Sequence, residues 1–192
     1  MTGAMHAAEI LYDLRRADLP IASCWFSFES ALHWLLVAAR SDWHERLGVD
    51  SAELGRRIAE VVFAGKPGFG VPKILLVEDD VDITDIKDVV WAFSTRAHPA
   101  HSELYFPDEA NVALYVYLDE KEKHTDRGTK VLHNCLLVDR YADGERPRKG
   151  RFDNGWPEAA HQKVLNSWTR YGYPDASGAP GVGAARSGRP GE

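Results

Sequence analysis

Residues 73–96 read KILLVEDDVDITDIKDVVWAFSTR, and this stretch decides the fold class. Its first part, residues 73–77, is a nearly continuous apolar run, which fits a strand buried on both faces, as in a parallel sheet. The run ends in acids, and residues 82–96 then follow as a helix with further acids in its first turn, where they complement the helix dipole. The inner stripe of that helix comprises Ile86, Val89, Val90 and Phe93.

Further helices and strands are predicted both before and after residues 73–96. Helical spacing predicts a helix over residues 5–17 and another after Asp50, a good N-cap with Glu53 three residues later as in a capping box. We expect Gly65 to end that second helix in the left-handed conformation. A last helix begins at Pro157. Strands are predicted over residues 21–28, 32–40, 102–106, 112–118 and 130–138.

This order of elements predicts an α/β fold, with helices alternating with strands around one mixed sheet. The 192 residues suffice for one compact domain with a core. Residues 174–192 are rich in Gly, Ala, Pro and Ser and have little to bury, so we expect a disordered tail. The predicted division is therefore an entry helix over residues 1–20, an α/β domain over 21–173 and the tail over 174–192.

Composition excludes several classes of protein. The net charge of −6 argues against a protein that binds the phosphate backbone of nucleic acids. The longest apolar run, residues 32–39, is interrupted by His33 and is far shorter than a membrane span. No signal peptide is recognisable, and Cys24 and Cys135 lie too far apart for a metal-spaced pair. We therefore expect a cytoplasmic protein with buried free thiols, acting on neither nucleic acid nor membrane.

The acids at the end of the central strand admit two interpretations. The string of residues 73–80 resembles the start of a response-regulator receiver domain, with magnesium at the acids and Asp119 as phosphate acceptor. Seventy-two residues precede it, however, and the later segments do not alternate as a receiver requires. The simpler interpretation is that Asp79, Asp80, Asp82 and Asp85 cap the helix and form a solvated turn. His98 and His101 flank Pro99 without further ligands, so we predict no metal site.

The continuation past the acids points to a family. Residues 79–96, DDVDITDIKDVVWAFSTR, resemble the signature segment of UbiD-type decarboxylases, in which an acidic strand end leads into a helix with Trp-Ala and Thr-Arg. Residues 7–10 (AAEI) resemble the connecting helix that enters that family's C-terminal domain. Residues 53–63 with 66–68 (KPG), residues 128–132 (GTKVL), 135–136 (CL) and 157–172 are similar to the ferulic and cinnamic acid decarboxylase branch. The resemblance covers residues 4–173.

The resemblance implies that this chain is one part of a larger enzyme. Family members catalyse reversible decarboxylation of unsaturated or aromatic carboxylic acids with prenylated FMN, which a separate N-terminal portion binds together with a metal ion and a Glu–Arg–Glu network. No segment here resembles that portion, so the resemblance implies no catalytic residue in this chain. We expect a subunit or C-terminal part that is inactive alone and assembles with a flavin-binding UbiD-like chain, with itself, or with both.

The resemblance also nominates four site residues. Lys87 stands where the branch has a lysine that reaches the flavin phosphate, although it also fits an ordinary solvated lysine. Phe93 would approach the substrate pocket, or simply pack in the core. Val112 and Leu114 stand at the lip of the pocket, where the family has an aromatic-proline-leucine run. Only Leu114 keeps the expected residue type, so the pocket should differ from a cinnamate pocket.

A second function remains open, a non-catalytic oligomerisation or interaction protein derived from the same domain. Five aromatic residues lie close together in the sequence, at Trp25, Phe26, Phe28, Trp34 and Trp43. If they leave both faces of the sheet apolar, they predict a large protein–protein interface. The alternative is a sheet that the chain's own helices cover on both sides.

Overall fold

The computed structural model of this chain describes residues 2–141, 145, 147 and 156–173. The chain divides into two compact units, Met1–Arg146 and Pro147–Glu192, and each is described by itself. The first unit holds the sheet and its helices. The second holds α5 (Glu158–Asn166), followed by the short 3-10 helix η4 (Thr169–Tyr171). The predicted tail over 174–192 lies outside the described residues, and the predicted domain boundaries stay a prediction.

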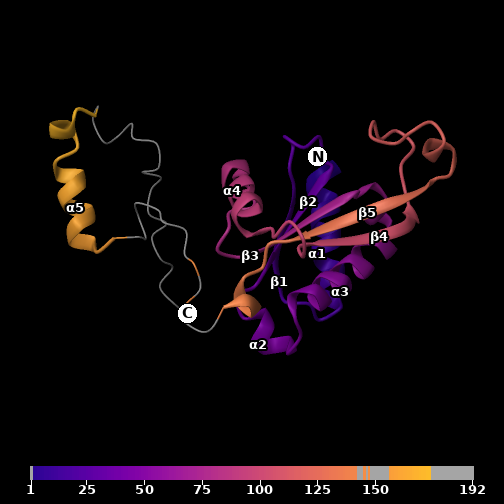
Figure 1. The fold of residues 1–192 in the computed structure, drawn as a ribbon, viewed down its shortest axis with the longest axis horizontal. Coiled ribbons are helices and arrows are strands. Elements are labelled where there is room, and N and C mark those ends of the chain that lie inside the picture. The colour runs from indigo at the N-terminus through magenta and orange to yellow at the C-terminus, as the bar shows by residue number, and fades with distance from the viewer. Residues whose placement is uncertain (1, 142–144, 146, 148–155, 174–192) are drawn as a thin grey trace. The chain divides into compact units, whose positions relative to one another are not determined.

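A five-stranded sheet with the order β1-β2-β3-β5-β4 forms the centre of the first unit (Figure 1). The strands are β1 (Ile21–Phe26), β2 (Trp34–Ala39), β3 (Lys73–Glu78), β4 (Glu103–Ala110) and β5 (Arg127–Asn134). The inner strands β2, β3 and β5 run parallel, whereas β1 and β4 pair antiparallel at the two edges. The predicted mixed sheet is confirmed, and β3 is buried on both faces as its continuous apolar run requires.

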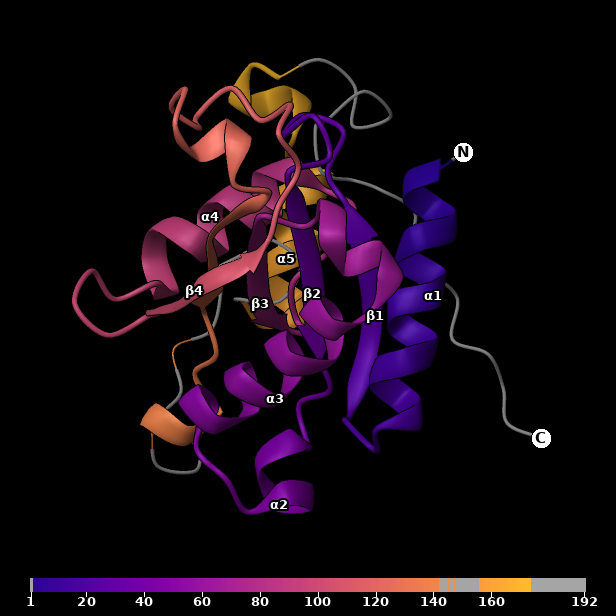
Figure 2. The ribbon, with the colours of Figure 1, turned by 90° about the vertical axis from the view of Figure 1, so that its right-hand side faces the viewer.

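Helices cover both faces of this sheet. One face carries α1 (Thr2–Arg16) and α3 (Ser51–Ala64), and the other carries α4 (Ile86–Arg96), as Figures 1 and 2 show. The short helix α2 (Trp43–Leu47) precedes α3. Alternate residues of β3 separate accordingly, because Ile74 and Leu76 join the α1 and α3 core while Leu75 and Val77 join the α4 core.

The clustered aromatic residues take part mainly in these two cores. Phe26 and Trp43 are buried beneath α1 and α3, and Trp25 and Trp34 pack against the α4 core. Phe28 alone among the five is mostly exposed. The sheet is therefore covered by its own helices, which was the alternative to two open apolar faces.

The predicted helix caps are present, with one difference in where a helix begins. Asp50 accepts a hydrogen bond from the Glu53 amide at 2.7 Å, and Asp85 accepts one from the Lys87 amide at 2.9 Å. Because Asp85 is the N-cap, α4 begins at Ile86 and not at residue 82. Asp82 instead accepts from the amide and hydroxyl of Thr84 in the preceding turn.

The predicted strand over residues 112–118 is wrong. The segment forms turns, and β4 extends to Ala110 in its place. Its apolar residues do not alternate between two faces, because Leu114 and Val116 are 89% and 92% exposed. Tyr115 and Leu118 are the buried ones, and their spacing of three is that of a turn.

The predicted left-handed conformation of Gly65 is also wrong. Gly65 is extended, with φ −76° and ψ 151°, and leads into the 3-10 helix η1 (Lys66–Gly70). The glycine that this turn requires is Gly68, where an added Cβ would lie 1.6 Å from the carbonyl oxygen of Val62. The backbone of η1 therefore packs directly against the backbone of α3, and this contact leaves no room for a side chain at residue 68.

A buried lysine on β5 donates a hydrogen bond to the same turn. Lys130 on β5 is 1% exposed, and its Nζ donates to the carbonyl of Gly68 at 2.7 Å and lies over the Phe63 ring. Burial lowers the pKa of Lys130 to about 8, with Glu109 acting weakly in the opposite direction.

This buried ammonium predicts a pH dependence of stability. Because the pKa is lower in the folded state, unfolding takes up a proton between pH 8 and the ordinary lysine pKa, and stability should rise with pH across that window. Urea unfolding at pH 7.5 and 9.5 should show wild type gaining about 1–2 kcal/mol relative to Lys130→Met. Both proteins share the raised pKa values of Cys24, Cys135 and Tyr115, so the difference isolates Lys130. Parallel pH curves would contradict the assignment.

Two further 3-10 turns, η2 (Glu122–His124) and η3 (Val138–Arg140), complete the first unit. In the part of the chain that the structure describes, no helix combines the length and the apolar character that crossing a bilayer demands.

Candidate functional site

A cleft of about 710 Å³ opens where β2, β3 and α4 begin. Four segments that are distant in the sequence supply its walls: the turn before β2, the first residue of β3, the first half of α4 and the loop after β4. The lining residues are Glu29, Ser30, His33, Trp34, Lys73, Ile86, Val90, Val116 and Tyr117. The cleft is thus bounded by the same helix that carries the DIKDVVWAFSTR segment.

The turn before β2 is held by its own serines. Ser27 donates to the Glu29 carboxylate at 2.9 Å, and the Ser30 hydroxyl donates to the Ser27 carbonyl while accepting from the Trp34 amide. The Glu29 backbone amide, followed by the Ser27 hydroxyl, keeps the pKa of Glu29 below its ordinary value. This wall of the cleft therefore carries a negative charge at neutral pH.

Aromatic rings and one lysine also lie in or beside the cleft. The ring centroids of His33 and Tyr115 lie 4.8 Å apart, and Tyr115 stacks on Tyr117 at 5.4 Å. The Nζ of Lys73 lies 5.6 Å from the centroid of the Tyr117 ring. Ile86 and Val90 of α4 add apolar side chains to the lining. The arrangement suits a planar ligand that is partly apolar and carries a negative group near Lys73.

The structure places two of the four predicted site residues on α4 and the other two in the loop after β4. Lys87 is exposed on α4, next to the lining residue Ile86 in the sequence, and is not itself part of the lining. Phe93 is half-buried behind the cleft, 5.9 Å from the ring of Trp34 and 5.2 Å from that of His133. Burial lowers the pKa of His133, which favours the neutral ring beside Phe93. Phe93 therefore contacts the lining residue Trp34 but is not itself part of the lining, and its role stays a prediction.

The remaining two, Val112 and Leu114, belong to the loop that supplies Val116 and Tyr117. Val112 is partly exposed, and Leu114 is almost fully exposed. None of the four predicted residues is among the nine lining residues, and sequence reasoning missed all nine as site residues, His33, Trp34, Lys73 and Tyr117 among them. They share no motif or spacing, because only the folded sheet brings their segments together.

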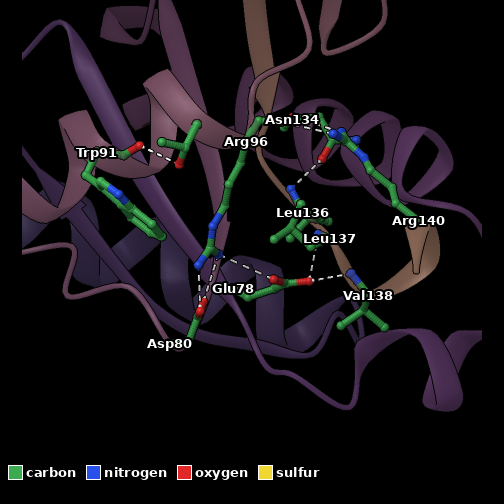
Figure 3. A network of polar contacts seen from close by, with 10 residues as sticks. Glu78, Asp80, Trp91, Arg96, Asn134, Leu136, Leu137, Val138 and Arg140 are labelled. Carbon is green, nitrogen blue, oxygen red and sulfur yellow. Dashed lines mark hydrogen bonds and ion pairs between the residues drawn. The ribbon is translucent and has the colours of Figure 1, made fainter. Parts of the chain in front are cut away.

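A second polar cluster lies at the opposite end of β3 and α4 (Figure 3). Glu78 is fully buried, accepts hydrogen bonds from the amides of Leu137 and Val138, and lies 3.5 Å from the Arg96 guanidinium. Arg96 also donates two hydrogen bonds to Asp80, at 2.9 and 2.6 Å. Burial alone would lower the pKa of Arg96, but Asp80 and Glu78 hold it above its ordinary value.

This network gives Asp80 a role that the prediction of capping acids missed, because Asp80 pairs with Arg96. Glu78 and Asp80 hold Arg96, Asp82 and Asp85 cap turns, and Asp119 accepts from the Glu122 amide in η2. The receiver interpretation is wrong, because Asp119 does not end a strand. Over residues 2–141 and the other described positions, no group of three or more His, Cys, Asp or Glu side chains is placed to hold a metal ion.

Comparisons with known proteins agree on one family. The profile of the C-terminal domain of 3-octaprenyl-4-hydroxybenzoate carboxy-lyase, named UbiD_C, matches residues 1–135. The pyrrole-2-carboxylic acid decarboxylase of Pseudomonas aeruginosa is 36% identical over 174 residues, covering 91% of this chain and 35% of its own length. Ferulic acid decarboxylase 1 of Saccharomyces cerevisiae is 28% identical, covering 90% of this chain and 35% of its own. The chain therefore spans about a third of the length of these relatives.

Solved structures share the fold at low sequence identity. The UbiD-class enzyme HmfF from Pelotomaculum thermopropionicum, in complex with FMN, has a TM-score of 0.59 at 12% identity and covers 76% of this chain and 30% of its own. The closed form of the vanillic acid decarboxylase ShVdcCD from Sedimentibacter hydroxybenzoicus also has a TM-score of 0.59, at 13% identity, and covers 84% and 32%.

Proposed function

Since this chain belongs to the UbiD family of carboxy-lyases, through its match to the C-terminal domain, we propose that it is the C-terminal part of a prenylated-FMN-dependent decarboxylase. It would act on unsaturated or aromatic carboxylic acids together with a flavin-binding portion, carried on the same polypeptide or on a separate chain. The observation that supports this most directly is the cleft, because the signature helix α4 forms one of its walls.

The residues of the cleft, together with Lys87 beside it in the sequence, fit an aromatic acid and a flavin in chemical character. Lys87 offers an exposed ammonium to a phosphate, whereas the amide of Lys87 at the helix terminus is already bonded to Asp85. The side chain, not the helix terminus, would therefore hold the phosphate. When bound, prenylated FMN supplies the electron sink for decarboxylation. This chain's residues would shape the apolar wall, exclude water and orient the acid.

The known relatives support this assignment. The pyrrole-2-carboxylic acid and ferulic acid decarboxylases act on heteroaromatic and unsaturated acids, as their names state. HmfF was solved with FMN, and an evolved dimeric form of it with prenylated FMN. The vanillic acid decarboxylase was also solved with one named component, ShVdcD, truncated. These relatives are the reason to look for a flavin-binding partner and for self-association.

The central experiment is co-purification of this chain with candidate flavin-binding portions from its own source. An absorbance scan would detect bound flavin, and a panel of acids that includes pyrrole-2-carboxylate and ferulate would test for decarboxylation. We expect a coloured complex that is active only when both parts are present. A colourless self-oligomer that captures no flavin-binding portion would refute the proposal and favour an interaction protein built on this domain.

Lys87→Ala should weaken retention of the cofactor in that complex about tenfold, the effect of losing one charge-assisted phosphate contact. The measurement is the flavin that remains bound after dilution and gel filtration. Lys66→Ala removes another exposed lysine, at the start of η1 beside α3 and α1, and should leave retention unchanged. Equal retention in both variants would show that Lys87 does not contact the phosphate.

A further inference from the structure

The loop that supplies one wall of the cleft has few anchors. Residues 111–118 form turns between β4 and η2, all of them described by the structure. Leu114 and Val116 extend into solvent, and Tyr117 is 48% exposed. Asn111, Tyr115 and Leu118 are buried. A wall of this kind keeps its shape only if one of these buried residues holds it in place.

Among these buried residues, Tyr115 makes contacts that connect the loop to η1 and to the turn before β2. Its hydroxyl donates to the carbonyl of Gly70 at 2.7 Å, across 45 residues of sequence. Its ring lies between two lining residues, tilted against His33 and stacked on Tyr117. Tyr115 does not line the cleft itself. The ring that contacts these two lining side chains is thus tied to backbone on a different element.

The acceptor of this hydrogen bond lies on a closely packed turn. Within η1, Pro67 and Gly68 are buried, and Gly68 is pressed against the Val62 carbonyl. The Nζ of Lys130 donates to the Gly68 carbonyl at 2.7 Å, and the Phe69 carbonyl lies 3.4 Å from the same nitrogen. Burial raises the pKa of Tyr115 to about 12, so its hydroxyl remains a donor at every physiological pH. The carbonyl that Tyr115 binds therefore has little freedom to follow a moving loop.

We infer that Tyr115 is a positioning residue for the cleft: its hydrogen bond to Gly70 fixes the loop of residues 111–118 and holds the rings of His33 and Tyr117 in the orientation that a bound ligand meets. The inference rests on the proposed function only in taking the cleft as the ligand site. According to this inference, a residue outside the lining determines the shape of one wall of the cleft.

The first test measures order in the loop and needs no ligand. Backbone 15N relaxation of wild type should give residues 114–117 order parameters near those of β3, about 0.85. In Tyr115→Phe the ring stays and the hydroxyl is lost, and we expect these values to fall below about 0.6 while β3 and β5 are unchanged. Tyr12→Phe on α1 removes another tyrosine hydroxyl, from an exposed residue, and should change nothing.

Two results would overturn the inference. The first is a loop that is equally ordered in wild type and Tyr115→Phe, or already mobile in wild type. The second is a uniform loss of stability in Tyr115→Phe without a local change in order, which would mark an ordinary structural residue.

The second test uses the complete complex with its flavin-binding portion. Tyr115→Phe should raise KM for the acid about tenfold, the ratio that corresponds to one hydrogen bond, while kcat changes less than KM. A lower kcat at unchanged KM would contradict a positioning role in binding. If the wild-type complex shows no decarboxylation, the proposed function fails, whereas the relaxation experiment still decides the role of Tyr115.

Discussion

Arg96→Met should lower the free energy of unfolding by about 3–5 kcal/mol, the cost of breaking a buried ion pair from one side. Arg96 is 2% exposed at its side chain and faces Glu78, which is fully buried. Methionine fills much of the space but leaves the Glu78 carboxylate with two backbone amides and no cation from residue 96. Urea denaturation monitored by circular dichroism measures the change.

The control is an exposed pair of the same chemistry. Arg56 and Glu53 lie 3.3 Å apart on the surface of α3, and Arg56→Met should cost less than about 1 kcal/mol. A loss for Arg96→Met as small as that of Arg56→Met would mean that solvent reaches Glu78. Loss of Arg96 would also affect the position of α4 at the cleft. Arg96 is the last residue of this helix, and Ile86 and Val90 in its first half line the cleft.

Gly68→Ala should destabilise the protein by more than about 3 kcal/mol, or prevent its accumulation in soluble form, because overpacking against backbone cannot be relieved by a rotamer change. The new Cβ would lie 1.6 Å from the Val62 carbonyl oxygen and 2.6 Å from its carbon. Relief requires that η1 move away from α3, which would also carry the Gly70 carbonyl away from Tyr115. Thermal unfolding and soluble yield measure the effect.

Gly70→Ala in the same turn is the matched control. A Cβ at that position meets only the Tyr115 hydroxyl oxygen, at an ordinary 3.9 Å, so we expect a change of less than about 1 kcal/mol. Similar melting temperatures for Gly68→Ala and Gly70→Ala would contradict the contact between η1 and α3.

Local sequence patterns predicted those elements whose burial is regular. The apolar run of β3 predicted a strand buried on two faces, and the helical spacing after it predicted α4; both elements are confirmed, although Val90 of the predicted inner stripe is 48% exposed. Asp50 predicted the start of α3 because a cap depends on residues within one turn. The error over residues 112–118 arose because Tyr115 and Leu118 are apolar anchors of a turn, and alternating apolar residues there resemble a strand.

The amino-acid sequence by itself determined the α/β class, the family through the DIKDVVWAFSTR segment, and the capping acids, because each of these depends on neighbours within a turn or a strand. Only the tertiary structure decided that His33, Lys73 and Tyr117 share one cleft, and that Glu78 and Arg96 form a buried pair. Parallel pairing of β2 with β3 places Trp34 beside Lys73, although thirty-eight residues separate them. Contacts at such separations depend on how the elements pack, and no local pattern of residues encodes them.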